Sequence, residues 1–191
     1  MSDTVAPVPK DLRILLAVKN QLASITVANG YQQDVSPDQI YIGKAVFGAN
    51  VPLPALTILE SNRPDGPDEY GSLKQGQTVS LKLTVQGWAT DVEEDSNDTV
   101  PLRALYTLKA DVMKCLARTI KESGPRAVYP AEKLFGRDAQ GQYLVASVTL
   151  GPGFVRATSA VSQGNTVVTG QASFYLSVTI EYTLNVTDPY L

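Results

Sequence analysis

Between Phe174 and Val186, every even-numbered position is apolar, and the odd-numbered positions carry hydroxyls, amides and one carboxylate. This period of two predicts a half-buried β-strand with one face on a core. The other face holds Tyr175, Ser177, Thr179, Glu181, Thr183 and Asn185. Lysine and glutamate usually occupy the solvent side of an exposed strand, so the sequence raises the question of what covers this one.

Two segments have helical spacing instead of alternation. The first is expected from Pro9 to about Ala28, where Asn29 and Gly30 would end it. Its expected apolar stripe is Leu12, Leu15, Leu16, Leu22 and Ile25. The second is expected from about Pro101, a residue suited to a first helical turn. Its expected stripe is Leu102, Leu105, Leu108, Val112, Met113, Leu116 and Ile120.

Further β-strands are expected where apolar and β-branched residues alternate or cluster between turn residues. These segments are Ile40–Phe47, Ala55–Ser61, Thr78–Gln86, Leu144–Leu150, Phe154–Val161 and Thr166–Ala172. Gly87 is expected to mark a bulge or a strand end, and residues 151–153 are expected to interrupt a strand. Short connections favour antiparallel pairing. The expected fold class is α+β: a mainly antiparallel β-sheet with two helices packed on one face and a long C-terminal β-hairpin.

The chain is expected to form one domain over residues 9–191, preceded by a flexible arm over residues 1–8. Long loops rich in proline, glycine and charge are expected at residues 62–77 and 91–98. Both are candidates for docking a partner. The candidate docking residues are Arg63, Asp65, Asp68, Glu69, Asp91, Glu93, Glu94 and Asp95.

Composition excludes several classes of function. The 191 residues carry a net charge of −3, with no basic run of the kind that grips nucleic acid. Apolar runs are too short for a transmembrane helix, and the N-terminus lacks a signal-peptide pattern. One cysteine precludes an internal disulfide and favours synthesis in a reducing compartment.

The side chains offer little catalytic chemistry. The absence of histidine removes Ser–His and Cys–His pairs and histidine-ligated metals. Cys115 is expected to be a core residue, not a nucleophile. In the acidic loop at residues 91–98, Asp91, Glu93, Asp95 and Asn97 occupy alternate positions, as ligands do in a calcium-binding loop. The glycine that such a loop needs at its turn is absent, which favours a solvated loop or one that docks a partner. No catalytic, cofactor or metal site is predicted, although an enzyme using carboxylates or Lys44, Lys74 or Lys82 stays an alternative.

Between Tyr143 and Thr187, Arg156 and Glu181 are the only charged residues. Long neutral strands left exposed are templates for aggregation, so something must cover them. A neighbouring subunit is the favoured cover, because depletion of charge marks interface cores. A position inside a larger sheet, covered by the chain itself, is the alternative. The interface candidates are Arg156, Thr158, Tyr175, Ser177, Thr179, Glu181 and Thr183.

Several of these segments, in this order, resemble a known family. They are an amphipathic helix followed by "NGYQQDV", "IYIGKAVFG", "LPALTILES", "LKLTVQGWA", the acidic loop with the second helix, and "IEYTLNVTDPYL". The chain resembles the tail terminator, or tail completion, proteins of long-tailed bacteriophages. The segment at residues 151–153 and the loop at residues 62–77 depart from that family's pattern.

The resemblance implies a virion structural protein, made in the host cytoplasm, with no catalytic residues and no cofactor. Such proteins form a ring, typically a hexamer, on the head-proximal end of the tail tube. The ring ends growth of tube and sheath and docks to the head connector, while DNA passes through its lumen without being held. The resemblance also implies that Tyr31 packs and Asp34 caps or pairs in a structural turn. The alternative is another tail, neck or baseplate ring, or a tube subunit.

Overall fold

The structure, a computed structural model, describes residues 7–44, 51–61, 77–89, 102–121, 135–137, 141, 143–156, 160–163, 166–169, 172–185, 188 and 190. Most of the expected arm and of the loops at residues 62–77 and 91–98 lies outside these ranges.

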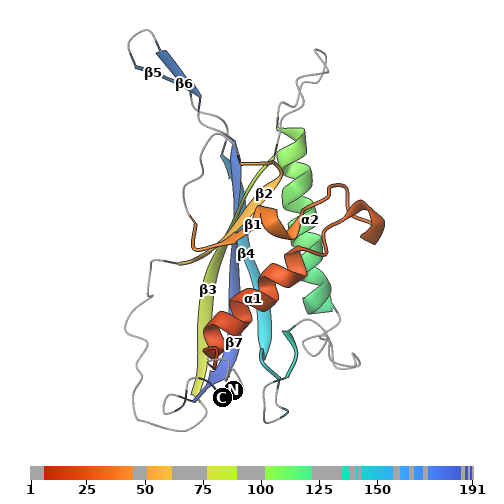
Figure 1. Cartoon of the computed structure of the whole chain (residues 1–191), viewed down its shortest axis with the longest axis vertical. Coiled ribbons are helices and arrows are strands. Elements are labelled where there is room, and N and C mark those ends of the chain that lie inside the picture. Colours follow the sequence, from red (N-terminus) through yellow and green to blue (C-terminus); the bar gives the residue numbers. More distant parts are fainter. Residues whose placement is uncertain are drawn as a thin grey trace, which may run out of the picture.

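Five strands form one mixed sheet, which confirms the α+β class (Figure 1). Their order is β1-β2-β3-β7-β4, with β1 parallel to β2 and every other pairing antiparallel. The strands are β1 (Ile40–Ile42), β2 (Ala55–Glu60), β3 (Gln77–Trp88), β4 (Ser147–Arg156) and β7 (Ser173–Leu184). A separate two-stranded sheet pairs β5 (Ala160–Gln163) with β6 (Thr166–Thr169).

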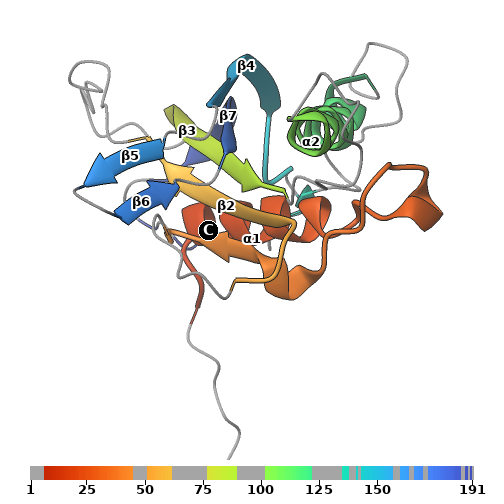
Figure 2. The same cartoon turned by 90° about the horizontal axis from the view of Figure 1, so that it is seen from above.

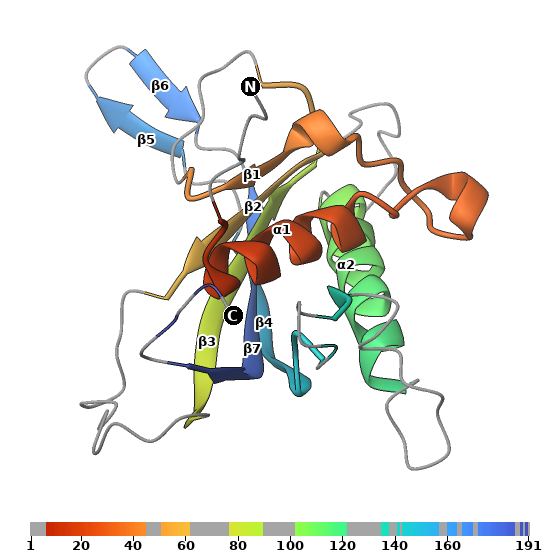
Figure 3. The ribbon, with the colours of Figure 1, turned by 60° about the horizontal axis from the view of Figure 1, so that its bottom comes forward.

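The helices α1 (Lys10–Leu22) and α2 (Arg103–Lys121) lie on the same side of the sheet (Figure 2). Figure 3 shows α1 lying across the strands, with α2 beside it. The core between the layers contains apolar side chains from both helices and from all but one strand of the five-stranded sheet. From β7 it receives Phe174, Leu176, Val178, Ile180 and Tyr182, all buried.

Helix α1 ends earlier than its spacing predicts. The hydroxyl of Ser24 donates to the carbonyl of Gln21 (2.7 Å), and the chain turns into a 3₁₀-helix, η1 (Val27–Asn29). Short hydroxyl side chains compete in this way with continuation of a helix. Gly30, with φ of 82°, caps η1 and not α1, so the expected end at Ala28 is wrong.

The buried stripe of each helix also differs from the expected one. Leu12 and Leu16 are 41% and 42% exposed, whereas Ile14 and Val18 are buried against the sheet. On α2, Met113 is exposed. On α1, apolar residues at helical spacing form two overlapping stripes, one with Leu12 and Leu16 and one with Ile14 and Val18. Contact with the sheet decides which stripe is buried.

Cys115 is fully buried, and its thiol donates to the carbonyl of Gln21 (3.2 Å). This contact joins the two helices and confirms the prediction of a core cysteine.

Strand β4 runs without a break through the predicted interruption at residues 151–153. Its register against β7 shifts there, from Leu150 opposite Val178 to Gly153 opposite Leu176. Two residues of β4 therefore oppose Ser177, which is the arrangement of a β-bulge. Because the bulge adds one residue, it reverses which side chains face the helices in the rest of β4.

Gly87 is the next-to-last residue of β3 and keeps the register with Phe174, so there is no bulge, and the strand ends at Trp88, one residue beyond the expected end. A Cβ atom on Gly87 would lie 2.2 Å from Cε1 of Phe174. The glycine is required by a close approach of this ring to the backbone of β3. The expected strand at Phe154–Val161 is wrong, because its first three residues belong to β4 and its last two to β5; the expected strand at Thr166–Ala172 is shortened to β6.

Candidate interaction surface

Strand β7 lies inside the sheet, paired with β3 along one edge and with β4 along the other. The idea that a neighbouring subunit covers an edge of this strand is therefore wrong. The chain itself satisfies both edges, as in the alternative interpretation. Only the polar face of β7 is left for a neighbouring subunit to cover.

The helices leave the second face of the sheet without a helical layer, and we call it the open face (Figure 2). Strand register assigns its side chains. On three of the strands they are Thr78, Ser80, Lys82, Thr84, Gln86 and Trp88 of β3; Ser147, Thr149, Phe154 and Arg156 of β4; and Tyr175, Ser177, Thr179, Glu181 and Thr183 of β7. Three of these side chains are charged, and most of the rest carry hydroxyls.

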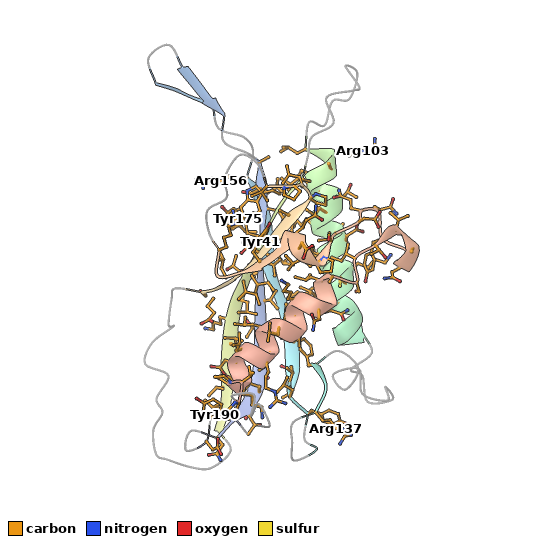
Figure 4. The ribbon with its side chains drawn as sticks, viewed as in Figure 1. Tyr41, Arg103, Arg137, Arg156, Tyr175 and Tyr190 are labelled. Atoms are coloured by element: carbon orange, nitrogen blue, oxygen red, sulfur yellow. The ribbon has the colours of Figure 1, made fainter. Side chains whose placement is uncertain are left out.

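A row of side chains crosses all five strands at one end of the open face. Each member is the direct partner of the next, in the order Phe154, Tyr175, Gln86, Thr57 and Tyr41. The rings of Phe154 and Tyr175 stack with centroids 5.0 Å apart, and the Gln86 amide donates to the Tyr175 hydroxyl (2.8 Å). We call this set the aromatic row; Figure 4 labels two of its members, Tyr41 and Tyr175.

Basic residues flank the aromatic row at both ends. The ammonium of Lys44 lies 4.5 Å from the ring centroid of Tyr41, and the carbonyl of Lys44 accepts from the Thr57 hydroxyl (2.8 Å). At the other end, Arg156 is exposed two residues beyond Phe154. Cationic side chains at the rim of an aromatic surface fit an acidic or neutral partner.

The bulge in β4 places Phe154 on the open face, where 62% of the residue is exposed. The Lys109 ammonium of α2 donates to the carbonyl of Gly153 (2.9 Å). A Cβ atom on Gly153 would lie 3.0 Å from both Leu176 and the Tyr175 carbonyl. Gly153 of β4 and Lys109 of α2 thus stabilise the bulge, and the bulge exposes the ring of Phe154.

The other end of the open face is rich in hydroxyl groups. Glu181 accepts a hydrogen bond from the Ser147 hydroxyl (2.8 Å), and Lys82 lies opposite Thr179. These are groups that hydrogen-bond across strands and fit another polar, uncharged surface.

Of the interface candidates, the structure brings together Arg156, Tyr175, Ser177, Thr179, Glu181 and Thr183 on the open face. Thr158 and all eight docking-loop candidates lie outside the described residues. Sequence reasoning missed Phe154, because the residue was assigned to a separate strand after the interruption. A glycine-flanked proline inside an alternating run was the available signal of a bulge.

In the turn after α1, two residues have the structural roles that the resemblance implies. Tyr31 is buried, and the carboxylate of Asp34 accepts the backbone N–H of Val27 (2.7 Å), which confirms both predictions. Sequence reasoning missed Asp111, a buried carboxylate of α2 that accepts the N–H groups of Gln32 and Gln33 (2.9 and 3.0 Å).

No family model matches the chain, and no curated protein matches it either. Within the described ranges, no helix is long and apolar enough to cross a lipid bilayer. The same ranges hold no group of three acidic or cysteine side chains arranged to bind a metal ion.

Proposed function

We propose that this chain is a structural subunit of a phage virion that assembles into a closed ring, caps the tail tube and docks the tail to the head connector. The open face carries the proposal. This face combines hydroxyls, a stacked aromatic pair of which Phe154 is exposed, and three charged side chains. Such a surface is suited to contact with protein, because charge is depleted and aromatic residues are enriched in interface cores.

The two edges of the sheet are compatible with a ring. At one edge lies β1, with three residues; at the other lies β4, with ten residues and a bulge. Contacts that join unlike surfaces of successive subunits are head-to-tail, and they close into a ring or continue as a filament. Strand addition at either edge is a recurrent way for protein chains to associate.

The charge of the chain agrees with a channel through which DNA passes. The net charge is −3, and the sequence has no basic run. Binding of nucleic acid that resists physiological salt requires many phosphate contacts from clustered lysine and arginine. The chain offers no such cluster by which DNA would be held.

The test is the mass of the purified chain in solution, measured by light scattering over a hundredfold range of concentration and followed by electron microscopy. A single closed species near six subunits is the expected result. Open filaments that lengthen with concentration would support the alternative, a tail tube subunit. A monomer at every concentration, with or without purified tail tubes, would contradict both.

No observation favours the enzyme alternative. Lys44 lies against the ring of Tyr41 and Lys82 lies in a row of hydroxyl groups. Lys74 lies outside the described residues.

A further inference from the structure

Asn29 and Gly30 form the only Asn-Gly pair of the sequence, and both residues are exposed. The pair lies in the loop between α1 and the 3₁₀-helix η2 (Pro37–Gln39), which projects beyond α2 (Figure 1). Glycine has no Cβ atom, so its backbone nitrogen can approach the side chain of the preceding asparagine closely. The chemistry of the pair therefore depends on how the fold holds this loop.

An Asn-Gly pair in an unrestrained chain converts spontaneously through a cyclic imide. The glycine nitrogen loses its proton to solvent and bonds to Cγ of the asparagine. The bond from Cγ to Nδ2 breaks, and ammonia leaves. Solvent water then adds to one carbonyl of the succinimide ring, which opens to aspartate or to isoaspartate. Water is the only co-reactant, and no electrons are transferred.

The folded loop restrains the nitrogen that must attack. The N–H of Gly30 donates to the carbonyl of Val27 (3.0 Å), so the proton that has to leave is held in a hydrogen bond. The carbonyl of Gly30 accepts from the Lys114 ammonium of α2 (2.6 Å). These two bonds hold Gly30 in the left-handed conformation, with φ of 82°.

The asparagine side chain is restrained as well. The amide nitrogen of Asn29 donates to the carbonyl of Ser24 (2.8 Å), and the backbone N–H of Asn29 donates to the carbonyl of Thr26 (3.0 Å). Attack on Cγ requires rotation of this side chain and of the backbone that carries it. The bonds must therefore break before the succinimide can form.

Opening of residues 27–30 leaves the core intact. These residues are all exposed, whereas Ile25 and Val35, on either side of them, are buried. The N–H of Val35 donates to the carbonyl of Ile25 (2.9 Å) and closes the base of the loop. Exposed segments of this kind open locally, at a free energy well below that of global unfolding. The hydrogen bonds of the segment itself then set how often it opens.

Lys114 ties this segment to α2. The lysine is exposed, and its ammonium also lies 5.0 Å from the ring centroid of Tyr31. A hydrogen bond from a charged donor is stronger than one between neutral groups. Truncation of Lys114 should therefore favour opening of the loop without removing a side chain from the core.

We propose that Asn29 is a modification site of the folded protein, where the chain converts slowly to isoaspartate and aspartate through a succinimide with Gly30. The reaction proceeds from the open state of residues 27–30, and Lys114 acts as a positioning residue that limits it. Both products add a negative charge and lack the amide that donates to the carbonyl of Ser24. This inference goes beyond the proposed function and does not rest on it.

Mass spectrometry of the full chain, incubated at physiological pH and temperature, tests the site. Trypsin cleaves after Lys19 and Lys44, and one peptide then contains both Asn29 and Asn20. Asn20 is also exposed but precedes a glutamine, so it is an internal control. Conversion of the amide to a carboxylate is expected at Asn29 and not at Asn20. Equal conversion at both, or none at Asn29, would overturn the site.

A synthetic peptide of residues 24–36 supplies the unrestrained rate. Asn29 in the folded chain is expected to convert about ten- to a hundredfold more slowly than in the peptide, because the loop must first open. A rate equal to that of the peptide would overturn the restraint by the fold. Asn29→Gln, which keeps an amide but requires a larger ring, is expected to give no conversion at this position. Labelling by an isoaspartate-specific methyltransferase identifies the product.

Lys114→Ala tests the restraint from α2. The variant is expected to raise the rate at Asn29 by up to about tenfold, the equivalent of one charge-assisted hydrogen bond. Lys114→Arg, which keeps a charged donor, is expected to stay close to the unmodified rate. The matched control is Lys109→Ala, because Lys109 of α2 donates to the carbonyl of Gly153 and not to this loop. Equal rates in the two alanine variants would overturn the role of Lys114.

The converted chain, separated by ion exchange through its added charge, tests the consequence for the loop. Asp111 of α2 accepts the N–H groups of Gln32 and Gln33, which follow the pair directly. Hydrogen exchange at these two groups is expected to be faster in the converted chain, while the N–H of Val178 in β7 keeps its protection. Unchanged exchange at Gln32 and Gln33 would overturn the opening of the loop by the modification.

Discussion

The two faces of β7 differ completely in their surroundings, although they belong to the same twelve residues. On one face Phe174, Leu176, Val178, Ile180 and Tyr182 are buried against the helices. On the other, the outward side chains are exposed or half-buried, apart from Ser173 at the start of the strand.

The comparison shows where the chain obtains its own stability and where it keeps surface for others. Burial of the helix-facing side chains stabilises the isolated subunit through the hydrophobic effect. The open face contributes hydrogen bonds such as that from Gln86 to Tyr175, which add little net stability. Substitutions on the two faces should therefore affect different equilibria, folding in one case and association in the other.

The largest effect on folding is expected from Ile180→Ala. This side chain is fully buried, so its truncation should lower the free energy of unfolding by about 2–5 kcal/mol. The neighbouring substitution Thr179→Ala, on the open face, should change it by less than about 0.5 kcal/mol. Urea unfolding followed by circular dichroism measures both. Equal losses for the two variants would show that the faces do not differ in this way.

A smaller loss is expected from Gly87→Ala. The new methyl group would meet the ring of Phe174, and overpacking of this kind costs about 1–3 kcal/mol. The matched test is a double-mutant cycle with Phe174→Leu. In the Phe174→Leu background, Gly87→Ala should lower the free energy of unfolding by less than it does in the unmodified chain. Strict additivity of the two changes would contradict the proposed clash.

A loss of about 1 kcal/mol is expected from Tyr175→Phe, because the Gln86 amide loses its acceptor on the open face. In a cycle with Gln86→Leu, the two changes should couple by a similar amount. Unfolding in urea gives the coupling. Zero coupling would mean that the hydrogen bond is replaced by water at no cost.

The smallest effect on folding and a large effect on association are expected from Thr179→Glu/Thr183→Lys. Glutamate at position 179 would lie opposite Lys82, and lysine at position 183 would lie two residues from Glu181, so strand pairing is preserved. The free energy of unfolding should change by less than about 0.5 kcal/mol. Burial of the added charges between subunits should weaken association by about 1.4 kcal/mol or more, which is tenfold.

The control for this variant carries the same two charges on the helix layer, as Asn20→Lys/Ala110→Glu at exposed positions of α1 and α2. It should assemble like the unmodified chain in light scattering. Full-sized rings from the open-face variant would show that this half of the face does not contact a neighbour.

The α+β class and most element positions could be predicted because their signals are local. Alternation identified β3 and β7, and helical spacing identified α1 and α2. The errors arose where a distant contact decided the outcome. The reason for a glycine at position 87 appears only when the ring of Phe174, 87 residues away, is placed against it. Leu12 reads as core until the sheet covers the other stripe of α1.

The candidate surface was predicted in part for the same reason. Period two places Tyr175, Ser177 and Thr179 on one face of a strand wherever that strand lies. Phe154 joins them only because a bulge in β4 reverses its orientation, and the bulge depends on the pairing with β7. The N–H groups of Gln32 and Gln33 bind Asp111 across a sequence separation of 79 and 78 residues, for which the local sequence has no signal.

The sequence by itself determined that β7 has an apolar and a polar face, since alternation is a property of neighbouring residues. It also determined that the polar face is nearly uncharged. The tertiary structure decided that the helices cover the apolar face, that β3 and β4 cover both edges, and that an aromatic row crosses the face left open. Those outcomes depend on pairing and packing between residues far apart in the chain, which only the folded arrangement brings together.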